Sequence, residues 1–245
     1  STPARGENAI LKALEELQRA PHLVPLSLRG GDAVNKVPAR CEVTVLEPSS
    51  AGSELYSPLH PAVIRALSTF TAGLSAAVAE FSEADVIFSP PTLTANVGQV
   101  HAEKDGAGLQ FDLRPLPGQD VDLLLTRLHD LAFHLSATVP LTATLEVQRR
   151  NPAFFTPYDA AILATGLRVL ARVGLPLEIV AKAGCTEAGL YGERGIPALV
   201  YGAGVAGGNI HVPNESTALS QLERSVDFYA GVIEAFCLTD SVPHS

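Results

Sequence analysis

The sequence predicts a mixed α/β protein in two parts: a two-layer antiparallel sheet-and-helix domain over residues 1–150, and part of a layered α/β domain over residues 151–245. In the first part, short apolar runs separated by turn residues predict hairpins, and helices with an apolar face follow them. In the second part, single predicted strands alternate with helices. The boundary falls at Arg149-Arg150-Asn151-Pro152, which interrupts both patterns.

The first part contains two predicted hairpin-plus-helix units, residues 24–81 and 92–135. Thr2-Pro3 predicts a helix start, because a hydroxyl residue suits the cap and proline suits the first helical position. Further helices are predicted at 60–81 and from Asp120, a capping residue, to 135. Strands are predicted at 24–28, 41–46, 92–102, 109–114 and 142–147, with a hairpin turn at Asp105-Gly106.

The second part is predicted to bring a polar loop to the end of a strand. A helix at 158–173 leads to a strand at 177–181, a short helix ending at 194 and a strand at 198–201. That strand stops at Gly202-Ala-Gly204, and a loop carrying His211 follows. An α/β sheet forms its sites at the carboxyl ends of its strands, so His211 is a candidate metal ligand or catalytic base.

The last predicted helix has one apolar face, which we expect to pack on the core. Its members are Leu219, Leu222, Val226, Tyr229, Ile233 and Phe236.

Composition restricts the class of protein. Hydrophobic residues make up 47% of the 245 residues and charged residues 18%, which is typical of a folded globular chain. The formal net charge of −9 argues against nucleic acid or an anionic membrane as a partner. We expect no apolar run long enough to cross a bilayer and no signal peptide.

The cysteines and the absence of methionine lead to predictions about the compartment and the processing of the chain. Cys41, Cys185 and Cys237 show no paired spacing, which indicates free thiols in a reducing, cytoplasmic compartment. Cys185 is either a nucleophile or a small buried residue. The chain contains no Met and opens at Ser1-Thr2-Pro3, so we expect a processed or excised piece of a longer protein.

Three motifs follow one another in the second part: Gly184-Cys-Thr-Glu187, Gly195-Ile-Pro197 and His211-Val-Pro-Asn-Glu215. In order and spacing they resemble the zinc-dependent amidohydrolases that include acetylornithine deacetylase, succinyl-diaminopimelate desuccinylase, carboxypeptidase G and the Xaa-His dipeptidases. The resemblance implies that residues 1–150 form a lid or dimerisation domain and residues 151–245 the C-terminal part of a catalytic domain. It also implies a preceding catalytic segment, absent here, that supplies the general base and most metal ligands.

The same resemblance assigns roles to individual residues. It implies that His211 binds one of two zinc ions, in a type of site that also accepts cobalt or manganese. Glu187 and Glu215 would orient the imidazole. Substrate would contact Asn35 in a Gly-Gly-x-x-x-Asn hairpin and Arg114 at the end of an Asp-x-Arg strand. The remaining substrate contacts would be Gly184, Thr186 and Gly204.

Several of these residues also have a purely structural interpretation. Asn35 could stabilise a turn, and Arg114 could form an ion pair with Asp112 or Glu146. The glycines could simply let strands end tightly. Glu215 could be an acidic residue at the start of a helix.

The predicted function is hydrolysis of an amide bond beside a free carboxylate, by a dipeptidase, aminoacylase or N-acyl-amino-acid deacylase. The expected partners are a small peptide or N-acyl amino acid, the absent catalytic segment, and a second copy bound through the lid. The alternative is a non-catalytic lid or dimerisation module, or a module that binds a small anion at Gly202–Gly204. The chain alone, with one candidate ligand, is expected to be inactive.

Overall fold

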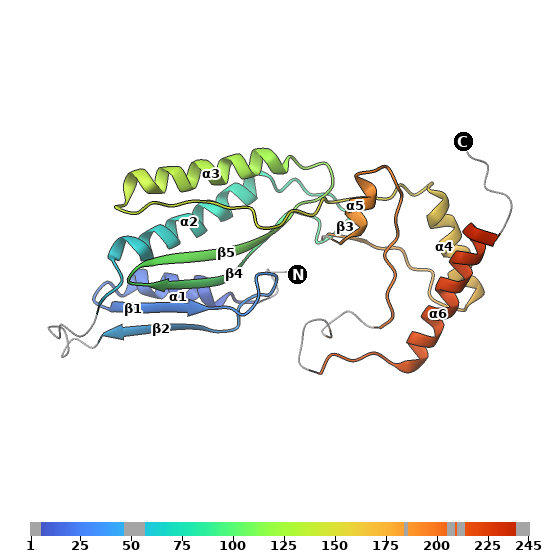
Figure 1. Ribbon diagram of the computed structural model, residues 1–245, viewed down its shortest axis with the longest axis horizontal. Coiled ribbons are helices and arrows are strands. Elements are labelled where there is room, and N and C mark those ends of the chain that lie inside the picture. Colours follow the sequence, from blue (N-terminus) through green and yellow to red (C-terminus); the bar gives the residue numbers. More distant parts are fainter. Residues whose placement is uncertain (1–5, 47–56, 184–185, 205–208, 210–213, 239–245) are drawn as a thin grey trace. The chain divides into compact units, whose positions relative to one another are not determined.

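The computed structural model describes residues 6–46, 57–183, 186–204, 209 and 214–238 (Figure 1). The chain divides into two compact units. The sheet unit comprises Ser1–Ala153 and Ala181–Gly184, and the C-terminal unit comprises Phe154–Val180 and Cys185–Ser245. An antiparallel sheet with helices makes this a mixed α/β protein, as predicted.

Both predicted hairpins of the first part belong to one four-stranded sheet, in the order β2-β1-β4-β5. The strands are β1 (Val24–Gly30), β2 (Cys41–Leu46), β4 (Thr94–Glu103) and β5 (Gly106–Arg114). All pairs are antiparallel, and the hairpins join where Leu28 pairs with Ala102 and Gly30 with Val100. The turn between β4 and β5 is Lys104-Asp105, one residue before the predicted position, because Gly106 already pairs with Glu103.

Side chains supply the missing backbone acceptors at the starts of the three helices of this unit. The helices are α1 (Ala9–Arg19), α2 (Pro61–Glu80) and α3 (Val121–Thr138). Asn8 Oδ1 accepts from the amides of Ile10 and Leu11, His60 Nδ1 from that of Ala62, and Asp120 Oδ1 from that of Leu123. Thr2-Pro3, the expected helix start, lies outside the described residues, but the helix that carries Ile10 and Leu14 does not begin there, because residues 6–8 are not helical and Asn8 is its cap.

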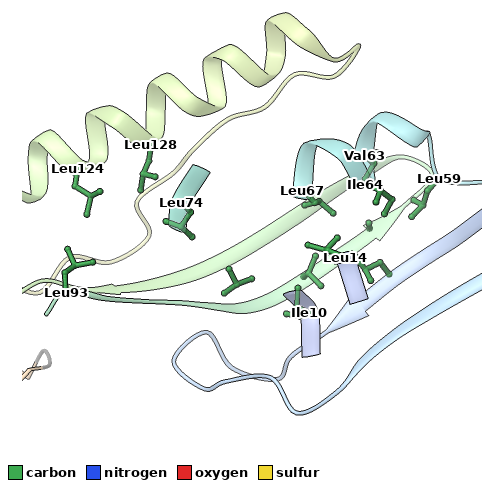
Figure 2. Packing of buried hydrophobic residues seen from close by; sticks show 14 residues of the cluster. Ile10, Leu14, Leu59, Val63, Ile64, Leu67, Leu74, Leu93, Leu124 and Leu128 are labelled. Carbon is green, nitrogen blue, oxygen red and sulfur yellow. The ribbon is translucent and has the colours of Figure 1, made fainter. Parts of the chain in front are cut away.

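The core of this unit lies between the helices and one face of the sheet (Figure 2). Ile10, Leu28, Leu124 and Leu128 are almost completely buried there, with neighbours from α1, α2, β1, β4 and α3. Strand side chains alternate between faces. The opposite face, which we call the open face, is accordingly polar, and Arg29, Glu42, His101 and Glu103 on it are exposed.

One described helix, α2, is long and apolar enough to span a membrane, judged by length and composition alone. The expectation that no apolar run reaches this length is therefore wrong. The core helix of a soluble protein passes the same test, and α2 packs on α1, α3 and β4.

A second, small sheet belongs to the same unit. β3 (Phe88–Ser89) pairs in parallel with β6 (Ala181–Lys182), and Phe88 packs with Leu116 and Ala183. The strand predicted at 177–181 is thus formed only at its last residue. The strand predicted at 142–147 is also wrong: the segment is irregular, although Leu145 packs against the main core.

The C-terminal unit contains α4 (Ala161–Arg172), α5 (Ala188–Gly192) and α6 (Leu219–Ile233), with a π-helical turn at Glu234–Leu238. α4 and α6 pack at Gly231, where a Cβ atom would lie 2.7 Å from Val169 Cγ1. Phe228 is buried beside the ring of Tyr201, with the ring centroids 4.1 Å apart. A glycine thus lets the two helices approach closely.

The strand predicted at 198–201 is wrong as well. Thr156 Oγ1 donates to the carbonyl of Ala198 and accepts from its amide, at 2.5 and 3.0 Å. These bonds occupy the backbone groups of Ala198 that a strand ladder would use.

The predicted inner face of α6 is exposed. Leu219 is 76% exposed and Val226 67%, whereas Ser225, Phe228 and Gly231 on the other side are buried. The expectation fails because α4 packs on the face with the small residue Gly231. The described residues leave much of the apolar stripe of Leu219, Leu222, Val226, Tyr229 and Ile233 exposed, although the Tyr229 ring packs beside Tyr201 and its hydroxyl donates to Tyr201 O at 2.8 Å.

We predict that Leu128→Ala lowers the free energy of unfolding by about 2–5 kcal/mol, because it leaves a cavity in a closely packed core. Phe133→Ala, on the same helix but 72% exposed, is the matched control and should change it by less than about 0.5 kcal/mol. Urea titrations of both variants measure the difference, and equal effects would contradict the assigned core.

Candidate functional site

Arg114, the last residue of β5, is aligned by a carboxylate two residues before it. Its Nε donates to Asp112 Oδ2 at 2.7 Å, and the Arg114 side chain is 20% exposed. This is the ion pair that the structural interpretation named. It uses Nε only, and Nη1 and Nη2 make no hydrogen bond with the residues that the structure describes. Asp112 therefore fixes the orientation of the guanidinium, and the Nη1 and Nη2 groups can still donate hydrogen bonds to a ligand.

Asn35 lies in the turn that follows β1, and it is half-buried. Its side chain makes no hydrogen bond within the described part of the chain, so it does not stabilise this turn through its amide. The backbone makes the turn instead: Lys36 N donates to Ala33 O at 3.2 Å.

The loop around Asn35, residues 31–38, is bound to β4 and α1. Asn96 Nδ2 on β4 donates to the carbonyls of Val34 and Lys36, at 2.9 and 2.7 Å. At the far end of the loop, Ala9 N donates to Pro38 O at 3.0 Å.

The sheet register places this loop and Arg114 at the same end of the open face. Asn96 pairs directly with Asp112, and Thr94 with Arg114. Directly paired residues share a face and lie about 5 Å apart at Cβ. The side chain that holds the Asn35 loop is therefore the cross-strand neighbour of the carboxylate that holds Arg114.

The other two described candidates, Thr186 and Gly204, belong to the C-terminal unit. Thr186 Oγ1 accepts from Ala188 N at 3.2 Å and Thr186 O accepts from Gly189 N, so Thr186 forms the turn that leads into α5, whose N-cap is Glu187. Gly204 has φ of 102°, a conformation that favours glycine. The neighbour of Gly204 among the described residues is Thr217, whose Oγ1 would lie 3.0 Å from a Cβ atom at this glycine.

Gly184, Cys185 and His211 lie outside the described residues, so their predicted roles stay predictions. Only the base of the loop carrying His211 is described. Asn209 Nδ2 donates to Ser216 O at 2.6 Å, and Asn209 Oδ1 accepts from Ser216 N at 3.2 Å. Glu187 and Glu215 are described, but the imidazole of His211 that they are predicted to orient is not, so this role also stays a prediction.

The described residues do not form a metal centre on their own. Nowhere among them do three His, Cys, Asp or Glu side chains come close enough to hold an ion. A zinc site needs three or four such ligands, so no catalytic step through a metal follows from this part of the chain.

The profile of the peptidase family M20/M25/M40 matches residues 20–235, which include the sheet, the Asn35 loop, Arg114 and all three sequence motifs. The chain belongs to this family. Its peptidases are hydrolases and are generally metal-dependent. A comparison with curated proteins finds no match.

Asn96 is a site residue that the sequence analysis missed. Two signals could have revealed it, since asparagine is uncommon inside strands and a glycine within a strand, here Gly98, often marks a bulge or a close backbone approach.

The two described cysteines differ sharply in environment. Burial raises the pKa of Cys41 to about 11, with a further contribution from neighbouring Glu42, whereas Cys237 is exposed. Because the thiolate is the reactive form, Cys41 should be nearly inert at neutral pH.

We predict that at pH 8 iodoacetamide modifies Cys41 at least about 100-fold more slowly than Cys237, since a pKa near 11 leaves about 0.1% thiolate. Peptide mass spectrometry over time measures both rates in one sample. Similar labelling rates would contradict the half-buried position of Cys41.

The raised pKa of Cys41 also predicts that this thiol's contribution to stability, complete below pH 9, is lost as the pH rises towards 11.

Proposed function

We propose that the protein containing this chain hydrolyses an amide bond beside a free carboxylate, as a dipeptidase, aminoacylase or N-acyl-amino-acid deacylase. The observation that carries the proposal is Arg114, oriented by Asp112 on the open face of the sheet. Family membership supports a metal-dependent hydrolase, and Arg114 supplies the reason for a substrate that bears a carboxylate.

Arginine suits this task because its planar guanidinium donates two parallel hydrogen bonds to a carboxylate. Asp112 occupies Nε, which leaves the Nη1 and Nη2 groups for the ligand. An arginine aligned in advance loses less side-chain entropy on binding than a freely rotating one.

Asn35 complements Arg114 in the proposed site. Its amide can donate to the acyl or peptide carbonyl and accept from an N–H group of the substrate. Gly184, Thr186 and Gly204 are proposed as further substrate contacts, on the strength of the sequence motifs.

The proposed metal is zinc, two ions in all, with cobalt or manganese as possible replacements. When bound, such ions lower the pKa of a coordinated water and polarise a carbonyl. His211 is the proposed ligand from this chain, and the remaining ligands would come from polypeptide outside it.

The two units take different proposed roles. The sheet unit would act as a lid that pairs with a second copy, and the C-terminal unit as part of a catalytic domain in a cytoplasmic enzyme. The uncovered apolar stripe on α6 supports a further catalytic segment that packs there, because contiguous exposed apolar surface commonly marks an interface.

We predict that Arg114→Ala raises KM for N-acetyl-amino acids about 10- to 100-fold, because hydrogen bonds to a charged group contribute about 1.5–3 kcal/mol. The matching N-acetyl-amino amides, which lack the carboxylate, should show almost no change. Hydrolysis by the zinc-loaded protein and calorimetric binding of the same compounds measure the effect.

Arg29→Ala is the matched control, since Arg29 is an exposed arginine of the same sheet, paired with Glu103 at 3.2 Å. It should leave both compound series unchanged. If Arg114→Ala affected neither series, or both equally, carboxylate recognition by Arg114 would be disproved.

A further inference from the structure

The side-chain amide of Asn96 forms hydrogen bonds with the backbone on both sides of Asn35. Its two N–H groups donate to Val34 O and Lys36 O, at 2.9 and 2.7 Å, and the residue is only 3% exposed. Both partners are carbonyl oxygens, which can only accept, so the orientation of the amide is determined.

This arrangement leaves an acceptor unsatisfied. Asn96 Oδ1 is buried and has no hydrogen-bond partner within the described residues. A buried polar atom without a partner destabilises the folded state. A residue that served only packing would avoid this penalty, so the two donated bonds must matter for the loop itself.

The strand beneath the loop is shaped to receive it. The register of β4 and β5 shifts between Val97 and Gln99, which makes Gly98 the extra residue of a bulge. A Cβ atom on Gly98 would lie 2.1 Å from Val34 O, and one on Gly31 would lie 1.9 Å from Gly98 O. Any side chain at either position would lift the loop away from Asn96.

We propose that Asn96, seated beside the Gly98 bulge, is a positioning residue that presents Asn35 to the substrate. The inference rests on the proposed substrate contact of Asn35. With the carbonyls of both neighbours held, the backbone around Asn35 is restrained. Its amide is therefore preorganised, which lowers the entropy lost when a ligand binds.

The same side chain also relates the loop to Arg114. Asn96 is the cross-strand partner of Asp112, which orients the guanidinium. Asn35 and Arg114 thus depend on two adjacent residues of one strand pair. An N-acyl amino acid fits this arrangement, because its carboxylate and its amide group are only two bonds apart.

The test replaces Asn96 with leucine, which has a similar volume and no donor, in the complete protein that contains this chain, because the chain alone is expected to be inactive. Hydrogen–deuterium exchange of the amides in residues 31–38 should become about tenfold faster, with β4 and β5 unchanged. KM for an N-acetyl-amino acid should rise about tenfold while kcat stays within about twofold. Asn96→Ser, which keeps one donor, should give intermediate values and serves if the leucine variant does not fold.

Gln119→Leu is the matched control. Gln119 is also a side-chain amide that bridges two backbone groups, Phe81 O and Leu116 N, both at 2.8 Å, but it does not contact the loop. Its loss should lower stability without changing exchange in residues 31–38 or KM.

Asn35→Ala separates the two hypotheses. Adding Asn96→Leu to Asn35→Ala should raise KM no further, because both changes remove the same interaction. If Asn35→Ala raises KM but Asn96→Leu changes neither exchange nor KM, the positioning role of Asn96 is wrong. If Asn35→Ala leaves KM unchanged, the substrate contact itself is wrong, and this inference fails with it.

Discussion

Burial of a single face of the four-stranded sheet is the constraint on which the rest of the sheet unit depends. Strand side chains alternate strictly, so once Val97 and Phe111 face the helices, Asn96, Asp112 and Arg114 must lie on the other side. The apolar core therefore decides which polar residues can meet. The candidate site is in this sense a consequence of packing on the opposite face.

The loop after β1 turns this polar face into a possible binding surface. A glycine bulge lets the loop lie directly on β4, and a buried asparagine holds it there at the expense of one unpaired oxygen. Both features lower local stability, and both fix the position of the loop. Features that lower the stability of a strand in this way are typical of functional sites.

The C-terminal unit has a different physical character. Its helices α4 and α6 pack closely through Gly231, yet much of the apolar surface of α6 is uncovered within the described residues. Residues 196–201 have the composition of a strand but no ladder, and the backbone of Ala198 pairs with a threonine side chain instead. Strand-like sequence needs a neighbouring strand before it forms a sheet, because a strand makes its hydrogen bonds only across to a partner.

Local signals in the sequence were sufficient for several features. The β4–β5 hairpin, strand β2 and the Asp120 cap were predicted correctly, since a turn and a cap depend on only a few neighbouring residues. The predictions that failed depended on distant partners: the buried face of α6, the strands at 142–147 and 198–201, and the helix start, where Asn8 rather than Thr2 is the cap.

The sequence by itself determined the family, through three motifs in fixed order, and it named Asn35 and Arg114 as candidates. Only the tertiary structure decided that the two share one end of one sheet face, and that Asn96 holds the loop that carries Asn35. Asn96 and the loop residues it binds are about 60 positions apart in sequence. No local pattern encodes that contact, because it arises only when the pairing of β1 with β4 brings the two hairpins into one sheet.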